Sequence, residues 1–313
     1  MVSGRSALAW IAASRGLPTD RDTTDRLRDH ATMQHTCHVT SVVIPAHNES
    51  GVILRLLDGL LADAAPGEFD VLVVCNGCTD DTAELARSRP GVRVLEIDAA
   101  SKVAALNVGD QQAQGFPRVY LDADIELSTQ SLRLVRDALE SFPSAAPRPV
   151  VDSRGGSLLV RGYFAIWSRL GYTTSHVLGS GIYALSEEGR GRFDTFPELI
   201  ADDGFVYCQF TPDERCNPPG ATFTIRAPRT VPSLVKRRVR IVAGNIELER
   251  KTGLHPQHDG PGWLSVVRHN PRLAFAAPFF VGVNTYASLA ARRRAKSGTA
   301  GPWSRDLSTR ESN

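Results

Sequence analysis

Residues 41–61 read SVVIPAHNESGVILRLLDGLL and contain a strand, a polar loop and a helix in succession. The apolar run Ser41–Pro45 is typical of a short buried strand. After the loop, apolar side chains recur at the spacing of one helix face, at Ile53, Leu56, Leu57, Leu60 and Leu61. A strand followed by an amphipathic helix is the repeating unit of a parallel sheet, so this segment predicts an α/β fold.

The same alternation continues to residue 145. Further strands are expected at Val71–Val74, Val92–Ile97 and Arg118–Leu121, and further helices from a cap at Thr79 or Asp80 to Arg87, over Val103–Gln112 and over Leu132–Leu139. Continuous apolar strands need cover on both sides. We therefore expect a mostly parallel, Rossmann-type sheet with helices on both faces and ligands at the carboxyl ends of its strands.

The second half is less regular. A proline-rich linker is expected at Phe142–Pro149, and the elements after it are helices at Leu158–Leu170, from Asp203 and over Leu234–Arg250, with strands at Gly179–Leu185 and near Ala221–Arg226. Residues Leu273–Ala291 are apolar but interrupted by Pro278 and Asn284, which favours a core or interfacial helix over a membrane span. The predicted divisions are a disordered leader at 1–36, a first half of the α/β domain at 37–145, a second half at 146–252 and a helical C-terminal extension at 253–313.

The charge and the cysteine content indicate which partners and which cellular compartment to expect. The 313 residues include 36 basic and 34 acidic side chains, a net charge of +2 that does not suggest a nucleic-acid partner. Between Arg226 and Lys251, however, the sequence contains eight basic residues and only two acidic ones, which suits an anionic ligand or membrane surface. Five cysteines without disulfide spacing and no convincing secretory signal indicate the cytoplasm. Arg292–Arg294, after the apolar segment, could bring the chain to the inner face of the cell membrane.

Polar clusters follow three of the predicted strands. They are Pro45–Glu49, Cys75–Asp81 and Asp122–Asp124, and the carboxyl ends of parallel strands lie along one edge of a sheet. Asp122 and Asp124 directly follow a buried strand, and two such carboxylates suit a hard cation, Mg²⁺ or Mn²⁺. Taken alone, an Asp-x-Asp pair is more often a solvated loop.

Six motifs in order resemble those of the family 2 glycosyltransferases of the GT-A fold. They are Val43–Glu49, Asn76–Thr82, the lysine-to-glycine motif Lys102–Gly109, the Asp-x-Asp pair at 122–124, the acidic motif Ala201–Phe205 and a loose Q-x-x-R-W motif at Arg237–Ile241. The resemblance covers residues 41 to about 250. It implies a GT-A-like domain that binds a nucleotide-diphosphate sugar, in which residues 37–145 form the nucleotide-sugar-binding half and residues 146–252 form the acceptor-binding half.

The resemblance also implies roles for individual residues. The nucleobase and ribose pocket would be formed by Pro45, Ala46 and Asn48, with Glu49 beside it. Asn76 stands where the family usually has an aspartate that reads the base, which leaves the preferred base open. Lys102 would face the base or the diphosphate, and Asp122 and Asp124 the ribose and the metal. Asp203 would deprotonate the acceptor hydroxyl beside Asp202, while Arg237 and Arg240 would steady the phosphates or the acceptor.

The implied reaction is metal-dependent transfer of a hexosyl group to a hydroxyl of a glycan, a lipid-linked acceptor or a small glycoside, as in cell envelope polysaccharide synthesis. Inversion at the anomeric carbon is the family's implied outcome. Ile241 replaces the motif's tryptophan, which argues against a processive synthase. His255 and His258 are candidates for a further metal ligand, although a surface histidine is the simpler interpretation.

Other interpretations remain open. Cys75 and Cys78 form a C-x-x-C pair that could be redox-active or bind metal. A catalytically inactive nucleotide-sugar-binding protein and a sugar nucleotidyltransferase are the alternative functions, although the latter's glycine-rich, arginine-containing loop is missing from Pro45–Gly51. Lys102 and the arginines of residues 236–240 could be solvated helix positions, and the pair Asp202–Asp203 could be charges favoured at a helix start.

Overall fold

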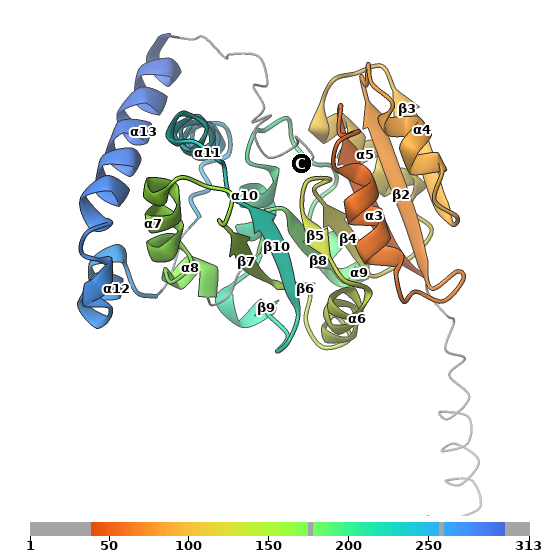
Figure 1. The fold of residues 1–313 in the computed structure, drawn as a ribbon. Helices are drawn as coiled ribbons and strands as arrows, with labels where there is room; N and C mark the ends of the chain where they lie inside the picture. The colour runs from red at the N-terminus through yellow and green to blue at the C-terminus, as the bar shows by residue number, and fades with distance from the viewer. Residues whose placement is uncertain (1–38, 175–177, 257–259, 298–313) are drawn as a thin grey trace, which may run out of the picture. The chain divides into compact units, whose positions relative to one another are not determined.

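The computed structural model describes residues 39–174, 178–256 and 260–297. The predicted leader and His258 lie outside these residues. Up to residue 145, strands and helices alternate as predicted (Figure 1). In chain order the elements are β1 (Thr40–Ala46), α3 (Ile53–Leu61), β2 (Phe69–Asn76), α4 (Thr82–Arg87), β3 (Val92–Ile97), α5 (Lys102–Gln112), β4 (Arg118–Leu121), β5 (Glu126–Leu127), α6 (Thr129–Ala138) and β6 (Ser144–Ala145).

The remaining elements include two long helices near the end of the described chain. They are β7 (Arg148–Asp152), α7 (Leu158–Trp167), α8 (Gly171–Thr174), β8 (Ile182–Leu185), α9 (Glu187–Arg190), α10 (Asp202–Tyr207), η1 (Pro212–Glu214), β9 (Arg215–Cys216), β10 (Thr222–Arg226), α11 (Val231–Thr252), α12 (Trp263–His269), η2 (Pro271–Leu273) and α13 (Ala277–Ser297).

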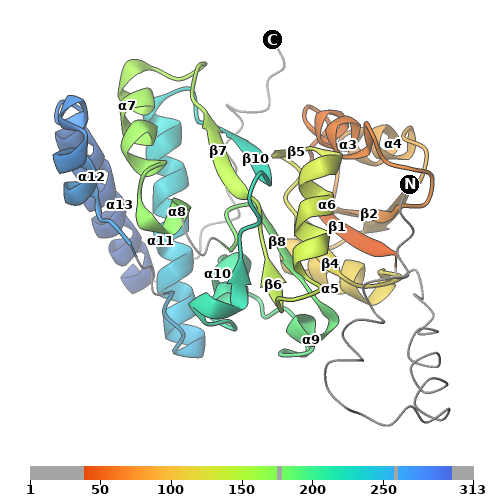
Figure 2. The ribbon, with the colours of Figure 1, turned by 90° about the horizontal axis from the view of Figure 1, so that it is seen from below.

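Seven strands form the main sheet in the order β3-β2-β1-β4-β8-β6-β9. The first four are parallel, as predicted, whereas β8 runs antiparallel to both β4 and β6. A second sheet has the order β5-β10-β7 (Figure 2). Because β8 runs against β4, the chain that precedes β8 lies next to the residues that follow β4.

The central strands alternate between two cores. Val42 and Ile44 of β1 pack with residues of α3 and α6, whereas Val43 packs with Val103 and Leu106 of α5. Successive side chains of a strand point to opposite faces, so a strand that is apolar throughout needs a helix on each side. The helices therefore cover both faces, as the continuous apolar strands predict.

Gly109 allows α5 to lie directly on the sheet. A Cβ atom at this position would be 2.4 Å from Cγ1 of Val43 and 3.1 Å from Cγ2 of Val74. Any side chain here would push the helix away from β1 and β2. The close approach brings Lys102, the first residue of α5, to the edge where the parallel strands end.

The C-terminal helices differ from the prediction. Pro278 does not interrupt the apolar segment, because it lies in the first turn of α13, where a helix needs no amide donor. Asn284 lies within the helix, and its Nδ2 donates to the carbonyl of Phe280 over 2.7 Å. Val239 of α11 packs against Ala287 and Ala291 of α13. Among the residues that the structure describes, none of the helices is both long and apolar enough to span a membrane.

Three smaller predictions are also wrong. The expected linker Phe142–Pro149 contains β6 and the start of β7, because the amides of Ser144 and Ala145 find partners in the sheet. Helix α7 ends at Trp167 rather than Leu170. Neither expected residue caps α4, which begins after Asp81, although the Asp80 carboxylate still accepts from the amide of Thr82 over 3.1 Å.

Candidate active site

The predicted Asp-x-Asp pair lies at the carboxyl end of β4. The amide of Asp122 donates to the carbonyl of Gly181 over 2.8 Å, which ties the end of β4 to the start of β8. Gly181 has a φ of 115°, a conformation that strongly favours glycine. Asp122 and Asp124 both line a cavity of about 390 Å³ that extends from the sheet edge to α7 and α11.

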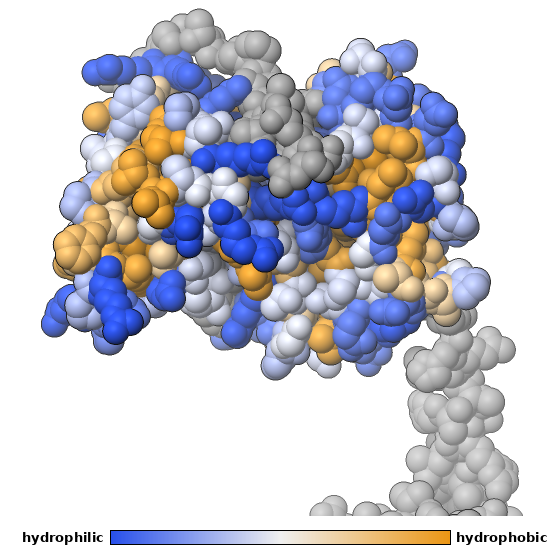
Figure 3. All heavy atoms as spheres, in the orientation of Figure 1, coloured by the Kyte–Doolittle hydropathy of each residue, from blue (hydrophilic) through white to orange (hydrophobic). Residues whose placement is uncertain are grey.

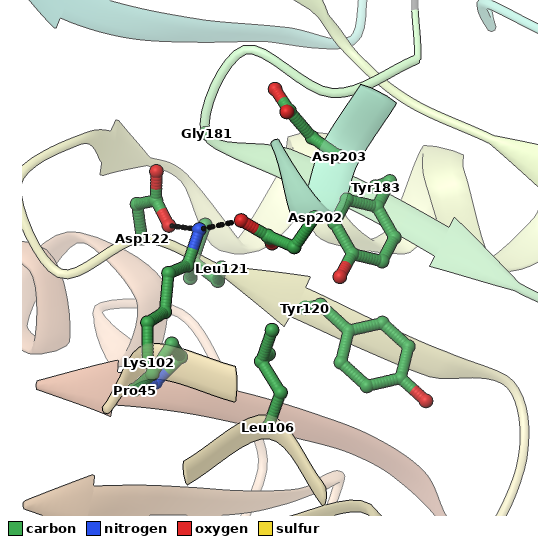
Figure 4. Close-up of a pocket in the computed structure, with 10 residues that line it drawn as sticks. All are labelled: Pro45, Lys102, Leu106, Tyr120, Leu121, Asp122, Gly181, Tyr183, Asp202 and Asp203. Carbon is green, nitrogen blue, oxygen red and sulfur yellow. Dashed lines mark hydrogen bonds and ion pairs between the residues drawn. The ribbon is translucent and has the colours of Figure 1, made fainter. Parts of the chain in front are cut away.

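Lys102 joins the two halves of the site. Its Nζ lies 2.8 Å from Oδ1 of Asp122 and 2.9 Å from Oδ1 of Asp202 (Figure 4). Burial lowers the pKa of this lysine, but the charges of Asp122 and Asp202 raise it more, so that the net pKa lies above its usual value. Lys102 is therefore a protonated bridge and not a solvated lysine at the start of a helix.

Asp202 and Asp203 begin α10 but occupy different environments. Asp202 is 3% exposed, and its Oδ2 has no hydrogen-bond partner among the described residues. Burial raises the pKa of Asp202 to about 6, although Lys102 opposes the shift. Asp203 lines the cavity, and its carboxylate accepts from the amides of Ser180 over 3.0 Å and Gly204 over 2.8 Å. Figure 4 shows Asp203 directed away from Lys102.

The residues expected around the nucleobase lie together at the ends of β1 and β2. Pro45 lines a smaller hollow with Lys102 and Asp122. Asn48 has a φ of 51°, and its Oδ1 accepts from the amide of Thr79 over 2.7 Å, which joins the loops after the two strands. Ala46 and Glu49 are buried, and neither lines the 390 Å³ cavity.

Asn76 is the most buried of the expected base-contacting residues. Its exposure is 0%, and neither polar atom of its side chain has a hydrogen-bond partner in the described part of the chain. Nδ1 of His47 contacts the backbone carbonyl oxygen of Asn76. A buried amide without partners is costly, but Asn76 lines neither the smaller hollow nor the 390 Å³ cavity.

Helix α11 brings the predicted arginines to the same cavity. Arg237 and Arg240 line it together with Lys236 and Arg238, which the sequence analysis did not select. The helical spacing of Leu234, Arg238, Ile241 and Asn245 could have identified this face of α11. An aromatic wall was also missed, because its members Tyr163, Phe164, Trp167 and Tyr172 resemble ordinary core residues in the sequence.

The cysteine and histidine alternatives find little support. Burial raises the pKa of Cys75 to about 12, and burial also raises the pKa of Cys78, so that both favour the thiol over the reactive thiolate. His255 Nδ1 lies 3.7 Å from Oε2 of Glu249, and both side chains are largely exposed. These contacts agree with the simpler interpretation of a surface histidine.

The two aspartates fit a hard divalent cation. Carboxylate oxygens are the ligands that Mg²⁺ and Mn²⁺ prefer, and both Asp122 and Asp124 face the cavity. Within residues 39–174, 178–256 and 260–297, no group of three or more His, Cys, Asp or Glu side chains is placed to hold a metal. A cation here would complete its shell with donor phosphates and water, as Mg²⁺ commonly does.

Comparison with solved structures places the fold among the glycosyltransferases. The mannosyltransferase PcManGT of Pyrobaculum calidifontis, solved with GDP-Man and Mn²⁺, superposes with a TM-score of 0.56 and 20% identity over 84% of this chain and 76% of its own. The glucosyl-3-phosphoglycerate synthase of Mycobacterium tuberculosis, solved with Mn²⁺, UDP and glucosyl-3-phosphoglycerate, gives 0.51 and 20% over 69% of this chain and 81% of its own. Both likenesses concern the fold.

The sequence also matches known glycosyltransferases. Glycosyltransferase AglE of Haloferax volcanii is 34% identical over 98 residues, which are 29% of this chain and 32% of the relative. The alignment thus spans about a third of the relative's length. The model of glycosyl transferase family 2 matches residues 41–191, which carry the strand-end loops, Lys102 and the Asp-x-Asp pair. This segment, just under half of the chain, is thus similar to glycosyl transferase family 2.

Proposed function

We propose that this chain transfers a sugar from a nucleotide-diphosphate donor to a hydroxyl of a glycan, a lipid-linked acceptor or a small glycoside. The main observation behind this proposal is that Asp122, Asp124 and Asp203 line one cavity, although they come from the two halves of the chain. A donor could therefore meet an acceptor within a single cavity. The first half would bind the donor, and the second half would bind the acceptor.

The proposed donor subsite lies at the strand ends. The nucleobase and ribose would bind near Pro45, Asn48 and Asn76, at the ends of β1 and β2. Asp122 and Asp124 would hold Mg²⁺ or Mn²⁺. When bound, the cation would neutralise charge on the diphosphate leaving group. Lys102 would keep Asp122 oriented and would add a positive charge beside it.

Asp203 is the proposed general base. Its carboxylate faces the cavity and is oriented by the amides of Ser180 and Gly204, so it can accept the proton of an acceptor hydroxyl. Asp202 is buried against Lys102 and is better placed to position that lysine than to reach an acceptor. The resulting displacement at the anomeric carbon would invert its configuration.

The test of this function is a screen of nucleotide sugars with and without Mn²⁺. We expect one donor to raise the melting temperature and to be slowly hydrolysed only when the metal is present. Binding without hydrolysis or transfer would favour an inactive nucleotide-sugar-binding protein. Formation of a nucleotide sugar from a sugar phosphate and a nucleoside triphosphate would favour a nucleotidyltransferase.

We also propose that the C-terminal helices touch the surface of an anionic membrane. Large apolar side chains are exposed there, with exposures of 95% for Phe275, 59% for Tyr286 and 52% for Leu289. Figure 3 shows hydrophobic and hydrophilic side chains side by side over the region of α12 and α13. Arginines 292–294 extend the positive charge along α13, which suits anionic headgroups.

A further inference from the structure

Arg238 is a cation at the acceptor end of the cavity that the proposed chemistry leaves unused. It lines the cavity from α11, and its Nε is buried without a hydrogen-bond partner in the described part of the chain. Burying a guanidinium nitrogen that makes no hydrogen bond costs free energy. A ligand that supplies an anionic oxygen would recover this cost.

The surroundings of Arg238 are aromatic. Tyr163 and Tyr172 line the cavity together with Arg238. The Tyr163 hydroxyl already lies 3.3 Å from Oδ1 of Asn284. Planar guanidinium groups pack well against aromatic rings while binding phosphate or carboxylate through their N–H groups.

An apolar surface continues from these rings. The ring of Trp167 is 5.7 Å from that of Phe164 and 6.0 Å from that of Tyr172, measured between centroids. Two isoleucines, Ile200 and Ile241, also line the cavity, with exposures of 50% and 37%. Exposed isoleucines in a cavity wall favour a ligand with an apolar body.

The charge of this wall is strongly positive. Lys236, Arg237 and Arg240 line the cavity beside Arg238 on the same helix. The acidic side chains that line the cavity are Asp122, Asp124, Asp202 and Asp203, and two of them are already paired with Lys102. The positive charge of the four basic side chains makes this wall of the cavity suitable for an anionic group.

We propose that the acceptor is an amphiphilic anion, a hydroxyl-bearing molecule that carries a phosphate or carboxylate next to an apolar body. Arg238 binds the anionic group, and the surface formed by Ile200, Ile241 and the aromatic wall binds the apolar body. The hydroxyl then faces Asp203 at the other end of the cavity. This inference rests on the proposed function, because it assigns the acceptor of the same site.

The test measures binding of four small probes by isothermal titration calorimetry below their micellar concentrations. Octyl phosphate and octanoate carry both an anion and an apolar chain, glycerol 3-phosphate lacks the chain, and octyl glucoside lacks the charge. We expect at least one octyl anion to bind roughly tenfold or more tightly than octyl glucoside, because it makes a charge-assisted hydrogen bond. It should also bind roughly tenfold or more tightly than glycerol 3-phosphate, because its apolar chain is buried. The preferred octyl anion distinguishes a phosphate from a carboxylate.

Variants of α11 locate the binding. Arg238→Gln should weaken binding of the octyl anion by roughly 10- to 100-fold. Arg250→Gln is the matched control, because Arg250 is an exposed arginine of the same helix outside the cavity lining. Ile241→Asp places a negative charge at a partly exposed position of the cavity wall and should also weaken binding of the octyl anion. This second variant keeps the test valid if Arg238→Gln fails to fold.

Two results would overturn the inference. One is equal affinity for octyl glucoside and the octyl anions, and the other is binding by Arg238→Gln or Ile241→Asp that matches Arg250→Gln. Titration of the unmodified chain with nucleotide diphosphates and Mn²⁺ separates this failure from a failure of the proposed function. If the unmodified chain binds the nucleotide but not the octyl anions, only the amphiphilic acceptor is ruled out. If it binds neither, the proposed glycosyltransferase site is ruled out as well.

Discussion

Asp202 and Asp203 are neighbours in the chain, but the start of α10 directs their carboxylates into different surroundings. Asp202 is buried against Lys102, whereas Asp203 lies on the cavity wall and is held by two backbone amides. A general base must reach the proton that it removes. The geometry therefore favours Asp203 as the proposed base, as the resemblance implies, and gives Asp202, the other catalytic candidate, a role in positioning Lys102.

We expect Asp203→Asn to separate binding from transfer. The amide keeps the shape of the side chain but cannot accept the proton, so sugar transfer should fall by roughly 10²- to 10⁴-fold. Nucleotide binding with Mn²⁺ should remain, because Asp203 does not belong to the proposed donor subsite. A transfer assay beside isothermal titration measures both. If transfer stays near that of the unmodified chain, Asp203 is only a charge at a helix start.

Asp124→Ala is the matching test of the donor subsite. It removes one of the two carboxylates that the cavity offers to a cation, so metal-dependent nucleotide binding and transfer should decrease together. Titration of the nucleotide diphosphate with and without Mn²⁺ measures the metal-dependent part. Unchanged Mn²⁺-dependent affinity would show that Asp124 is a solvated loop residue.

At the scale of elements, α5 depends on its contact with β1. Gly109→Ala would place Cβ 2.4 Å from Cγ1 of Val43, a clash between two packed elements. We expect the free energy of unfolding to fall by about 1–3 kcal/mol, the usual cost of overpacking, when measured by urea denaturation. The control is Gly282→Ala in α13, where no atom lies within 4 Å of the added methyl group.

The control should be neutral or stabilising, because alanine is favoured over glycine within a helix by about 0.5–1 kcal/mol. Equal stabilities of Gly109→Ala and the unmodified chain would mean that α5 can move away from the sheet at little cost. Since α5 carries Lys102, such mobility would also weaken the proposed link between its position and the site.

Helix α13 is the element on which the proposed membrane contact depends. Because Val283 and Ala287 are buried against the rest of the fold, deletion of the helix would damage the core. The better test replaces exposed residues, with Phe275→Ser and Leu289→Ser in one variant and glutamine at Arg292, Arg293 and Arg294 in another. Both should reduce binding to anionic vesicles in a flotation assay.

High salt should also release the unmodified chain, since each arginine near an anionic surface contributes about 1 kcal/mol of screened attraction. Binding that resists carbonate extraction would contradict a contact limited to the membrane surface. Equal binding to neutral and anionic vesicles would show that the arginines play no part.

At the scale of the whole molecule, a buried ion cluster joins α5, β4 and α9. Asp110 accepts from Arg118 over 2.6 Å and from Arg190 over 2.8 Å, and it also contacts the Tyr120 hydroxyl. Burial raises the pKa of Asp110, but hydrogen bonds from Arg190, Tyr120 and Arg118 lower it more. The net pKa in the folded chain is therefore below the unfolded value of about 3.9.

A lowered carboxyl pKa contributes stability above the unfolded value, and this contribution is lost as the pH falls through the folded value. We expect Asp110→Asn to reduce the free energy of unfolding by about 3–5 kcal/mol at pH 7, because it leaves buried arginines unpaired. The loss should shrink below about pH 4. Urea unfolding at pH 7 and below about pH 4 measures this loss of stability. Asp137→Asn, at an exposed carboxylate, is the control and should have little effect. A loss independent of pH would exclude the carboxylate charge as its cause.

Local sequence patterns predict the parallel half of the fold and the three polar clusters of the candidate site. Strand and helix periodicity are local properties, and residues at the ends of parallel strands lie along one edge, so the loops after β1, β2 and β4 could be placed near one another in advance. The role of Lys102 came from the resemblance to a family. The acidic motif and the arginines of α11 came from the resemblance to a family. Asn76 was predicted to read a base, but its complete burial was not evident from its neighbours in the chain.

Which distant segments share the cavity depends on how whole elements pack. The bridge from Lys102 to Asp202 spans a hundred residues and depends on β8 running antiparallel to β4. Arg238 comes from α11 and the aromatic wall from α7 and α8, and no local pattern distinguishes a ring facing a cavity from one in a core. Periodicity shows which face of a helix is apolar, whereas the packing of whole elements determines what that face contacts.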